Sequence, residues 1–158
     1  MHDEHDWIRS VYNIGLEGYS SQDCHYAIQA FEGFLRWVEN WKVEPLYVEK
    51  NMVSEKHQYG GTPDLIAEVN GKVALVDWKT SKERLYPTIF IQLAAYDNLC
   101  VEILSSDIEE YHVLRIPKNQ EKPSFSHSYW SELPKEAWQS VRALLNLQKA
   151  ETRLKELL

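Results

Sequence analysis

Residues 59–81 read YGGTPDLIAEVNGKVALVDWKTS, and this segment has the pattern of a β-hairpin. Two apolar-rich segments, residues 62–69 and 73–80, flank the pair Asn70 and Gly71. Asn-Gly between such segments is the strongest short signal for a hairpin, because a type I′ turn needs positive φ at both central positions. The sequence therefore predicts two antiparallel strands with a defined register.

This register brings two aspartates together. With a two-residue loop, Val69 pairs with Lys72, and Asp64 then lies directly opposite Asp77. Side chains alternate between the two faces of a sheet, so both aspartates share one face with Lys79. Both faces are apolar in their middle, which predicts a hairpin inside a sheet covered on both sides. Facing like charges are destabilising, so we expect a divalent metal with oxygen ligands between them.

The same residues resemble a known nuclease motif. Residues 61–64 (GTPD), followed after twelve residues by 77–79 (DWK), resemble the Asp…(Asp/Glu)-x-Lys core of the PD-(D/E)XK nuclease superfamily. Gln92 and Tyr96 resemble the Gln-x-x-x-Tyr motif of its RecB-like exonuclease branch, and His5 resembles that branch's metal-binding histidine. The resemblance implies an α/β (α+β) fold with a restriction-endonuclease-like core, in which helices flank a central mixed sheet. We expect one such domain over residues 1–158.

The resemblance also implies an activity. It indicates a metal-dependent DNA exonuclease of phage or bacterial type that hydrolyses phosphodiester bonds in recombination, repair or genome processing. The expected cofactor is Mg²⁺, for which Mn²⁺ can substitute. The expected substrate is DNA that is single-stranded or has free ends, with a helicase or recombinase as a partner. Three alternatives stay open: a structure-selective or site-specific endonuclease on the same core, a non-catalytic nucleic-acid-binding subunit, and a non-nuclease metalloprotein whose motifs are coincidental.

Phosphodiester hydrolysis assigns a role to each residue of the core. A metal held by carboxylates can activate water, neutralise the phosphate and stabilise the leaving oxygen. We expect Asp64, Asp77 and the backbone carbonyl of Trp78 to be the ligands, and Lys79 to contact the attacking water or the scissile phosphate. The alternative for Asp77 and Lys79 is a simple ion pair at the surface.

Further candidates surround this core. Glu49 is expected beside the hairpin, as a supporting acid or an extra ligand, or else as a solvated strand residue. His5 is a candidate metal ligand, or else a frayed terminal residue. Gln92 and Tyr96, four residues apart on one helical face, are expected to position the DNA backbone and the lysine, or else to be boundary and core residues. Candidate phosphate contacts are Thr80, Ser81, Lys82, Arg115 and Lys118, although the first three could equally form a turn with solvated charges.

Composition limits these interpretations. The 158 residues carry a net charge of −7, so a nucleic-acid groove must be a local basic strip on an acidic protein. Two cysteines, Cys24 and Cys100, are too few for the four-cysteine iron–sulfur cluster of some relatives. No apolar run approaches the ~20 residues of a membrane span. The expected location is the cytoplasm of a bacterial or phage-infected host cell.

Apolar periodicity and turn residues predict the remaining elements. Residues 59–61 are expected to form a turn or bulge, and residues 117–131 an irregular segment with room for an added strand. The expected helices cover residues 2–18, 20–41, 87–104 and 132–158, and the expected strands cover 46–56, 62–69, 73–80 and 109–116.

Overall fold

A five-stranded mixed sheet forms the centre of the computed structural model, which describes residues 20–80, 85–116 and 125–157. The strands lie in the order β1-β4-β5-β6-β7. β5 and β6 run parallel, whereas the other neighbours are antiparallel. The bounds are β1 (Val43–Val48), β4 (Leu65–Val69), β5 (Lys72–Lys79), β6 (Glu110–Arg115) and β7 (Ser126–Trp130).

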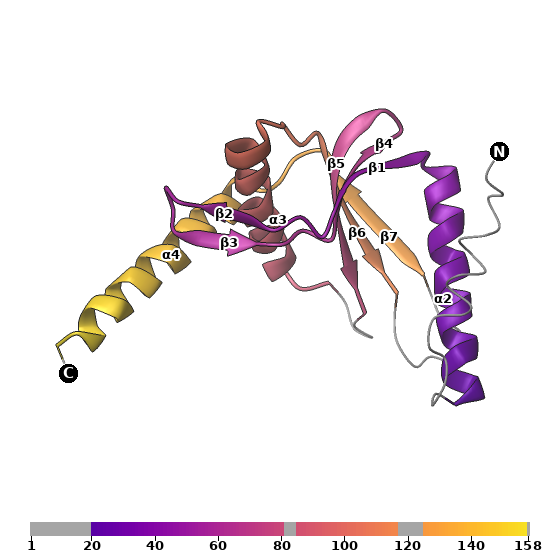
Figure 1. Ribbon diagram of the computed structural model, residues 1–158, viewed down its shortest axis with the longest axis horizontal. Coiled ribbons are helices and arrows are strands. Elements are labelled where there is room, and N and C mark those ends of the chain that lie inside the picture. Colours follow the sequence, from indigo (N-terminus) through magenta and orange to yellow (C-terminus); the bar gives the residue numbers. More distant parts are fainter. Residues whose placement is uncertain (1–19, 81–84, 117–124, 158) are drawn as a thin grey trace.

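Helices cover both faces of this sheet, as Figure 1 shows. Helix α2 (Ser21–Asn40) lies on one face, and α3 (Thr88–Leu99) lies on the other. A π-helix, η1 (Cys100–Leu104), continues α3, and α4 (Lys135–Lys155) packs against α3. This arrangement confirms the predicted fold class, an α/β domain with a mixed sheet between helices. The expected helix over residues 2–18 lies outside the described residues.

The two faces of the central hairpin explain why helices pack on both sides. Ile66 and Leu75 are buried under α3, while Ala67 and Ala74 are buried under α2. Small residues on the second face allow the large ring of Trp37 in α2 to approach the sheet. Alternation along a strand therefore separates the core into two layers.

The predicted strand over residues 46–56 is wrong. The chain forms β1 up to Val48, turns at Glu49 with φ of 46°, and continues as β2 (Met52–Ser54), so two short strands replace the single predicted one. The predicted turn over 59–61 is instead β3 (Tyr59–Gly61), which pairs with β2 in a separate small hairpin. Pro45 lies inside β1, where an outer strand and a register shift after Pro45 tolerate it.

The later elements follow the prediction more closely. The expected helix over 87–104 is α3 followed by η1, and the expected strand over 109–116 is β6. Residues 126–130 form the added strand β7 at an outer edge of the sheet. Within the described part of the chain, no helix is both long and apolar enough to cross a membrane.

Candidate active site

The hairpin has the predicted register. Val69 pairs with Lys72, the ladder continues to Leu65 opposite Val76, and Asn70 and Gly71 have φ of 51° and 80°. Asp64 and Asp77 are the next residues in this register, just beyond the last ladder pair. The backbone N–H of Trp78 donates to Asp64 Oδ2 at 2.7 Å, which draws the Asp64 carboxylate to the β5 backbone beside Asp77. The two aspartates are therefore neighbours at one end of the hairpin.

Asp77 carries its carboxylate in the protein interior, with 1% of the residue exposed. Lys79 Nζ lies 2.5 Å from Asp77 Oδ2 and forms an ion pair with it. Oδ2 is buried and, within the described residues, makes no hydrogen bond of good geometry, so the ion pair is its main compensation. Burial raises the pKa of the Asp77 carboxyl; the Lys79 ammonium opposes this shift, and the charge of Asp64 adds to it.

A hydrogen-bonded chain links this ion pair to helix α3. Lys79 Nζ donates to Gln92 Oε1 at 3.0 Å, and Gln92 Nε2 donates to the Tyr96 hydroxyl at 3.1 Å. Gln92 and Tyr96 lie four residues apart, so one face of α3 presents both toward the end of β5. Gly61 of β3 contacts the Tyr96 ring so closely that an added Cβ would lie 2.6 Å from Cε1. Three elements thus fix the position of the Lys79 ammonium.

The remaining candidate residues differ in how close they lie to Asp64 and Asp77. Glu49 is exposed and lies outside any strand, contrary to the prediction, and its backbone N–H donates to the Asp64 carbonyl at 3.0 Å. Thr80 is exposed just after β5. Arg115 is the ladder partner of Lys79, and its Nε donates to Ser126 Oγ at 3.1 Å. His5, Ser81, Lys82 and Lys118 lie outside the described residues.

The alternative interpretation, a simple ion pair of Asp77 and Lys79 at the surface, agrees with the structure in the contact but not in the location. The two groups are in contact, but the Asp77 side chain is 2% exposed and that of Lys79 is 30% exposed. Lys72 lies at the opposite end of β5 from Lys79. It binds Glu110 Oε1 at 2.6 Å and is not available to the aspartates.

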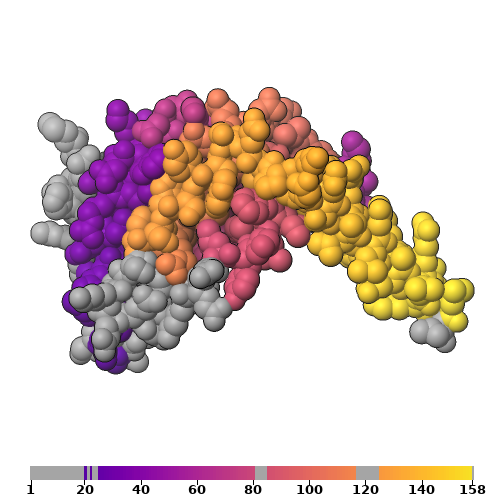
Figure 2. Space-filling model, turned by 180° about the vertical axis from the view of Figure 1, so that it is seen from behind, coloured from indigo at the N-terminus to yellow at the C-terminus, as the bar shows by residue number. Residues whose placement is uncertain are grey.

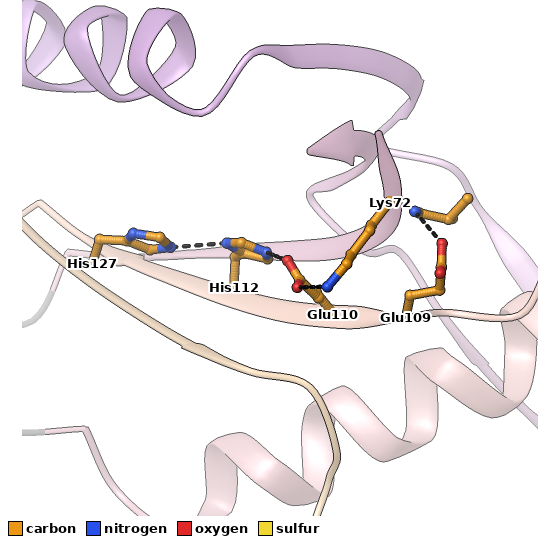
Figure 3. Close-up of polar contacts among 6 residues, drawn as sticks. Lys72, Glu109, Glu110, His112 and His127 are labelled. Carbon is orange, nitrogen blue, oxygen red and sulfur yellow. Dashed lines mark hydrogen bonds and ion pairs between the residues drawn. The ribbon is translucent and has the colours of Figure 1, made fainter. Parts of the chain in front are cut away.

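A second polar cluster lies on the α2 face of the sheet and was not predicted from the sequence. His112 is fully buried, and its Nδ1 lies 2.9 Å from Nε2 of His127. His112 Nε2 lies 3.3 Å from Glu110 Oε2, and Lys72 completes the row that Figure 3 shows. Burial lowers the pKa of both histidines, that of His127 to about 4. Alternation in β6 places Glu110 and His112 on one face, a signal that the sequence does contain.

Comparisons with known proteins bear on the fold. A scan against protein-family models finds no match, and neither does a search of curated proteins. Among solved structures, the chain matches a crystal structure described as "Putative exonuclease" from Eubacterium rectale, with a TM-score of 0.57 and 10% identity. This chain shares its fold with that protein. The match covers 92% of this chain and 59% of the Eubacterium protein.

A second solved structure, SSO0001, matches with a TM-score of 0.44 and 18% identity, over 86% of this chain and 62% of that one. The chain therefore spans about three fifths of the length of each protein. The likeness to the Eubacterium protein concerns the fold alone. In this chain the fold places Asp64, Asp77 and Lys79 side by side.

The carboxylate oxygens of Asp64 and Asp77 are of the kind that could hold a magnesium ion. Within the described residues, no three side chains from His, Cys, Asp or Glu come together as a metal site. Magnesium does not need such a cage, because it keeps several waters and is bound by one or two carboxylates. The buried Asp77 Oδ2 without a well-directed hydrogen bond is an oxygen to which a cation would add a favourable contact.

Proposed function

We propose that this chain is a magnesium-dependent deoxyribonuclease of the RecB-like PD-(D/E)XK type. The observation that supports this proposal is the row Asp77–Lys79–Gln92–Tyr96 beside Asp64. A buried carboxylate and a lysine held by a glutamine on a neighbouring helix form a costly arrangement. Such strained ionisable groups are typical of catalytic sites.

Asp64, Asp77 and the Trp78 carbonyl would hold the ion, and His5 is an additional candidate. When bound, Mg²⁺ supplies a Lewis acid and an activated water, and Mn²⁺ would substitute for it. Glu49 belongs to the proposal only as a residue at the rim, because its side chain is exposed.

Lys79 has a chemical role that the metal ligands cannot fill. Its side chain is 30% exposed, so its ammonium can reach a phosphate oxygen or the attacking water while it contacts Asp77. Gln92 Oε1 accepts a hydrogen bond from one of the three N–H groups of the Lys79 ammonium, and this bond orients the other two. A cation already fixed near the developing negative charge lowers the barrier without further reorganisation.

The proposed substrate is DNA that has free ends and is single-stranded in part. The protein would cleave it exonucleolytically during recombination, repair or phage genome processing. Thr80 and Arg115 lie at the same end of the sheet as Lys79 and are proposed phosphate contacts, together with Ser81, Lys82 and Lys118. A helicase or recombinase that delivers such ends is the proposed partner.

End-labelled linear DNA and closed circular DNA, each with chelator or millimolar Mg²⁺, test the proposal. Linear DNA should be degraded only with Mg²⁺, and circles should stay intact. Asp77→Asn, which keeps the side-chain shape, should abolish cleavage, while Glu49→Gln at the exposed rim should retain most of it. Nicked circles would indicate an endonuclease instead, and binding without cleavage would indicate a non-catalytic subunit.

A further inference from the structure

A polar groove lies between helix α4 and the turn that joins β2 to β3, away from the candidate active site. Its volume is about 370 Å³. We call it the α4 groove, and its polar lining residues are His57, Gln58, Gln148, Lys149, Thr152 and Arg153. Figure 1 shows the β2–β3 hairpin extending from the sheet to α4, and Figure 2 shows α4 projecting from the body of the protein.

The lining of the α4 groove favours an anion. Lys149 and Arg153 lie one helical turn apart and face the same side of α4. Within the described residues, neither forms an ion pair and no carboxylate lines the groove. Gln148, Gln58 and His57 add side-chain N–H donors. In a chain with a net charge of −7, this grouping of donors is a local exception.

The wall opposite α4 is held in place by its own bonds. The backbone N–H of His57 donates to Ser54 Oγ at 2.9 Å, and Ser54 Oγ donates to Glu102 Oε2 at 2.7 Å. The His57 ring packs edge-on against Trp138 of α4, with 5.6 Å between ring centroids. The two walls of the α4 groove are therefore fixed relative to each other before any ligand binds.

The hairpin sets the distance between the groove and the candidate active site. Asp64 follows Gln58 by six positions, so the chain between them spans at most about 20 Å at roughly 3.3 Å per residue. Stacked nucleotides rise about 3.4 Å each, so a strand of about six nucleotides could contact both places. A stacked strand of four nucleotides would span only about 14 Å.

We propose that the α4 groove binds the phosphate backbone of the nucleic-acid strand whose end lies at Asp64 and Asp77. This rests on the proposed function for the identity of the strand. The groove would add affinity for substrates of more than about six nucleotides and take no part in the chemistry. It would thereby set a minimum length for efficient binding.

The test measures binding of fluorescent single-stranded DNA of 4 and 15 nucleotides in chelator, at several salt concentrations. The variant is Lys149→Gln with Arg153→Gln. The matched control is Lys135→Gln with Lys155→Gln, which removes the same charge from α4 outside the groove. We expect the variant to bind the 15-mer about tenfold more weakly and the control to bind like wild type. The salt slope of the variant should fall by about 1.4, and its 4-mer affinity should not change.

Equal loss in variant and control would show a general charge effect and overturn the proposal, as would unchanged 15-mer binding in a variant that melts like wild type. Competition by inorganic phosphate equal to that by the 15-mer would assign the groove to free phosphate instead. Cleavage is read separately. If the wild type does not cleave DNA but the variant shows the length-dependent loss of binding, the groove proposal stands and the proposed nuclease activity is wrong. If the wild type cleaves DNA and the variant shows no such loss, the nuclease proposal stands and the groove proposal is wrong.

Discussion

Asp77 is the residue at which folding and the proposed chemistry conflict. Its folded pKa is raised above the unfolded value, so this group favours the fold at low pH and loses that contribution as pH rises through the folded pKa. At neutral pH the ionised carboxylate therefore destabilises the protein when no cation is bound. Lys79 compensates only in part, because the net shift is still upward.

The first prediction follows from this sign. Asp77→Asn should raise the free energy of unfolding in chelator at pH 7 by on the order of 1 kcal/mol, because it removes a buried charge and keeps the volume. Magnesium should raise the melting temperature of wild type by mass action and that of the variant much less. Thermal melts in chelator and in millimolar Mg²⁺ measure both effects. A less stable variant with an equal magnesium shift would argue against a shared metal.

The second prediction orders three variants along the hydrogen-bonded row. Lys79→Ala should reduce the single-turnover cleavage rate by about 10²–10³-fold, because it removes a charge near the reacting phosphate. Gln92→Leu should cost less, since Lys79 remains but is less well oriented, and Tyr96→Phe should cost least. Calorimetric titration should show little change in magnesium affinity for all three. A loss of metal binding in Lys79→Ala, with normal chemistry at saturating metal, would contradict the role given to Lys79.

At the scale of elements, β3 and α3 pack so closely at Gly61 that the Tyr96 ring leaves no room for a Cβ atom. Gly61→Ala would place a methyl carbon 2.6 Å from Tyr96 Cε1, so the ring or the strand must move. We expect a loss of about 1–3 kcal/mol in stability from this overpacking, and a lower cleavage rate because Tyr96 supports Gln92. Tyr96→Leu should relieve the clash, so the double variant should be less destabilised than the sum of the two single ones. Additive losses in chemical denaturation would rule out this contact.

How far the sequence predicts each element depends on the range of the interactions that form it. The β4–β5 register follows from Asn70 and Gly71, which act locally, and it places Asp64 and Asp77 correctly. The break at Glu49 follows no local rule, because a non-glycine residue with positive φ is held there by the surrounding structure. His112 and His127 meet only because β6 pairs with β7, and His57 meets Trp138 only because β2–β3 reaches α4. Such contacts cannot be recognised before the topology is known.

At the scale of the whole molecule, the cluster of His112, His127 and Glu110 makes stability depend on pH. The folded pKa of both histidines is lowered, so the fold binds fewer protons than the unfolded chain at mildly acidic pH. Their contribution is complete above the unfolded value of about 6.5 and is lost as pH falls toward about 4. Glu110 acts in the same direction, because its pKa is lowered by Lys72 and His112 against the opposing effect of burial.

The resulting prediction concerns acid sensitivity. Wild type should lose stability steadily between pH 6.5 and pH 4, by up to about 1.4 kcal/mol per pH unit for each histidine that titrates. His127→Gln keeps a hydrogen-bonding side chain beside His112 but cannot take up this proton, so its stability should fall less steeply. His25→Gln, at an exposed position on α2, is the matched control and should follow wild type. Denaturant titrations at half-unit pH steps compare the three slopes, and parallel slopes would exclude the cluster as the cause.

The proline in β1 has a consequence for how copies of this protein behave at high concentration. β1 is an outer strand of the sheet and exposes Leu46, Tyr47 and Val48, a combination that invites strand addition from a second molecule. Pro45 has no backbone N–H to donate, and the register shift before Tyr47 interrupts the even spacing of the hydrogen-bonding groups along β1. The edge of β1 is thereby a poor template for β-pairing with a second molecule. Its apolar side chains can stay exposed without promoting aggregation through strand addition.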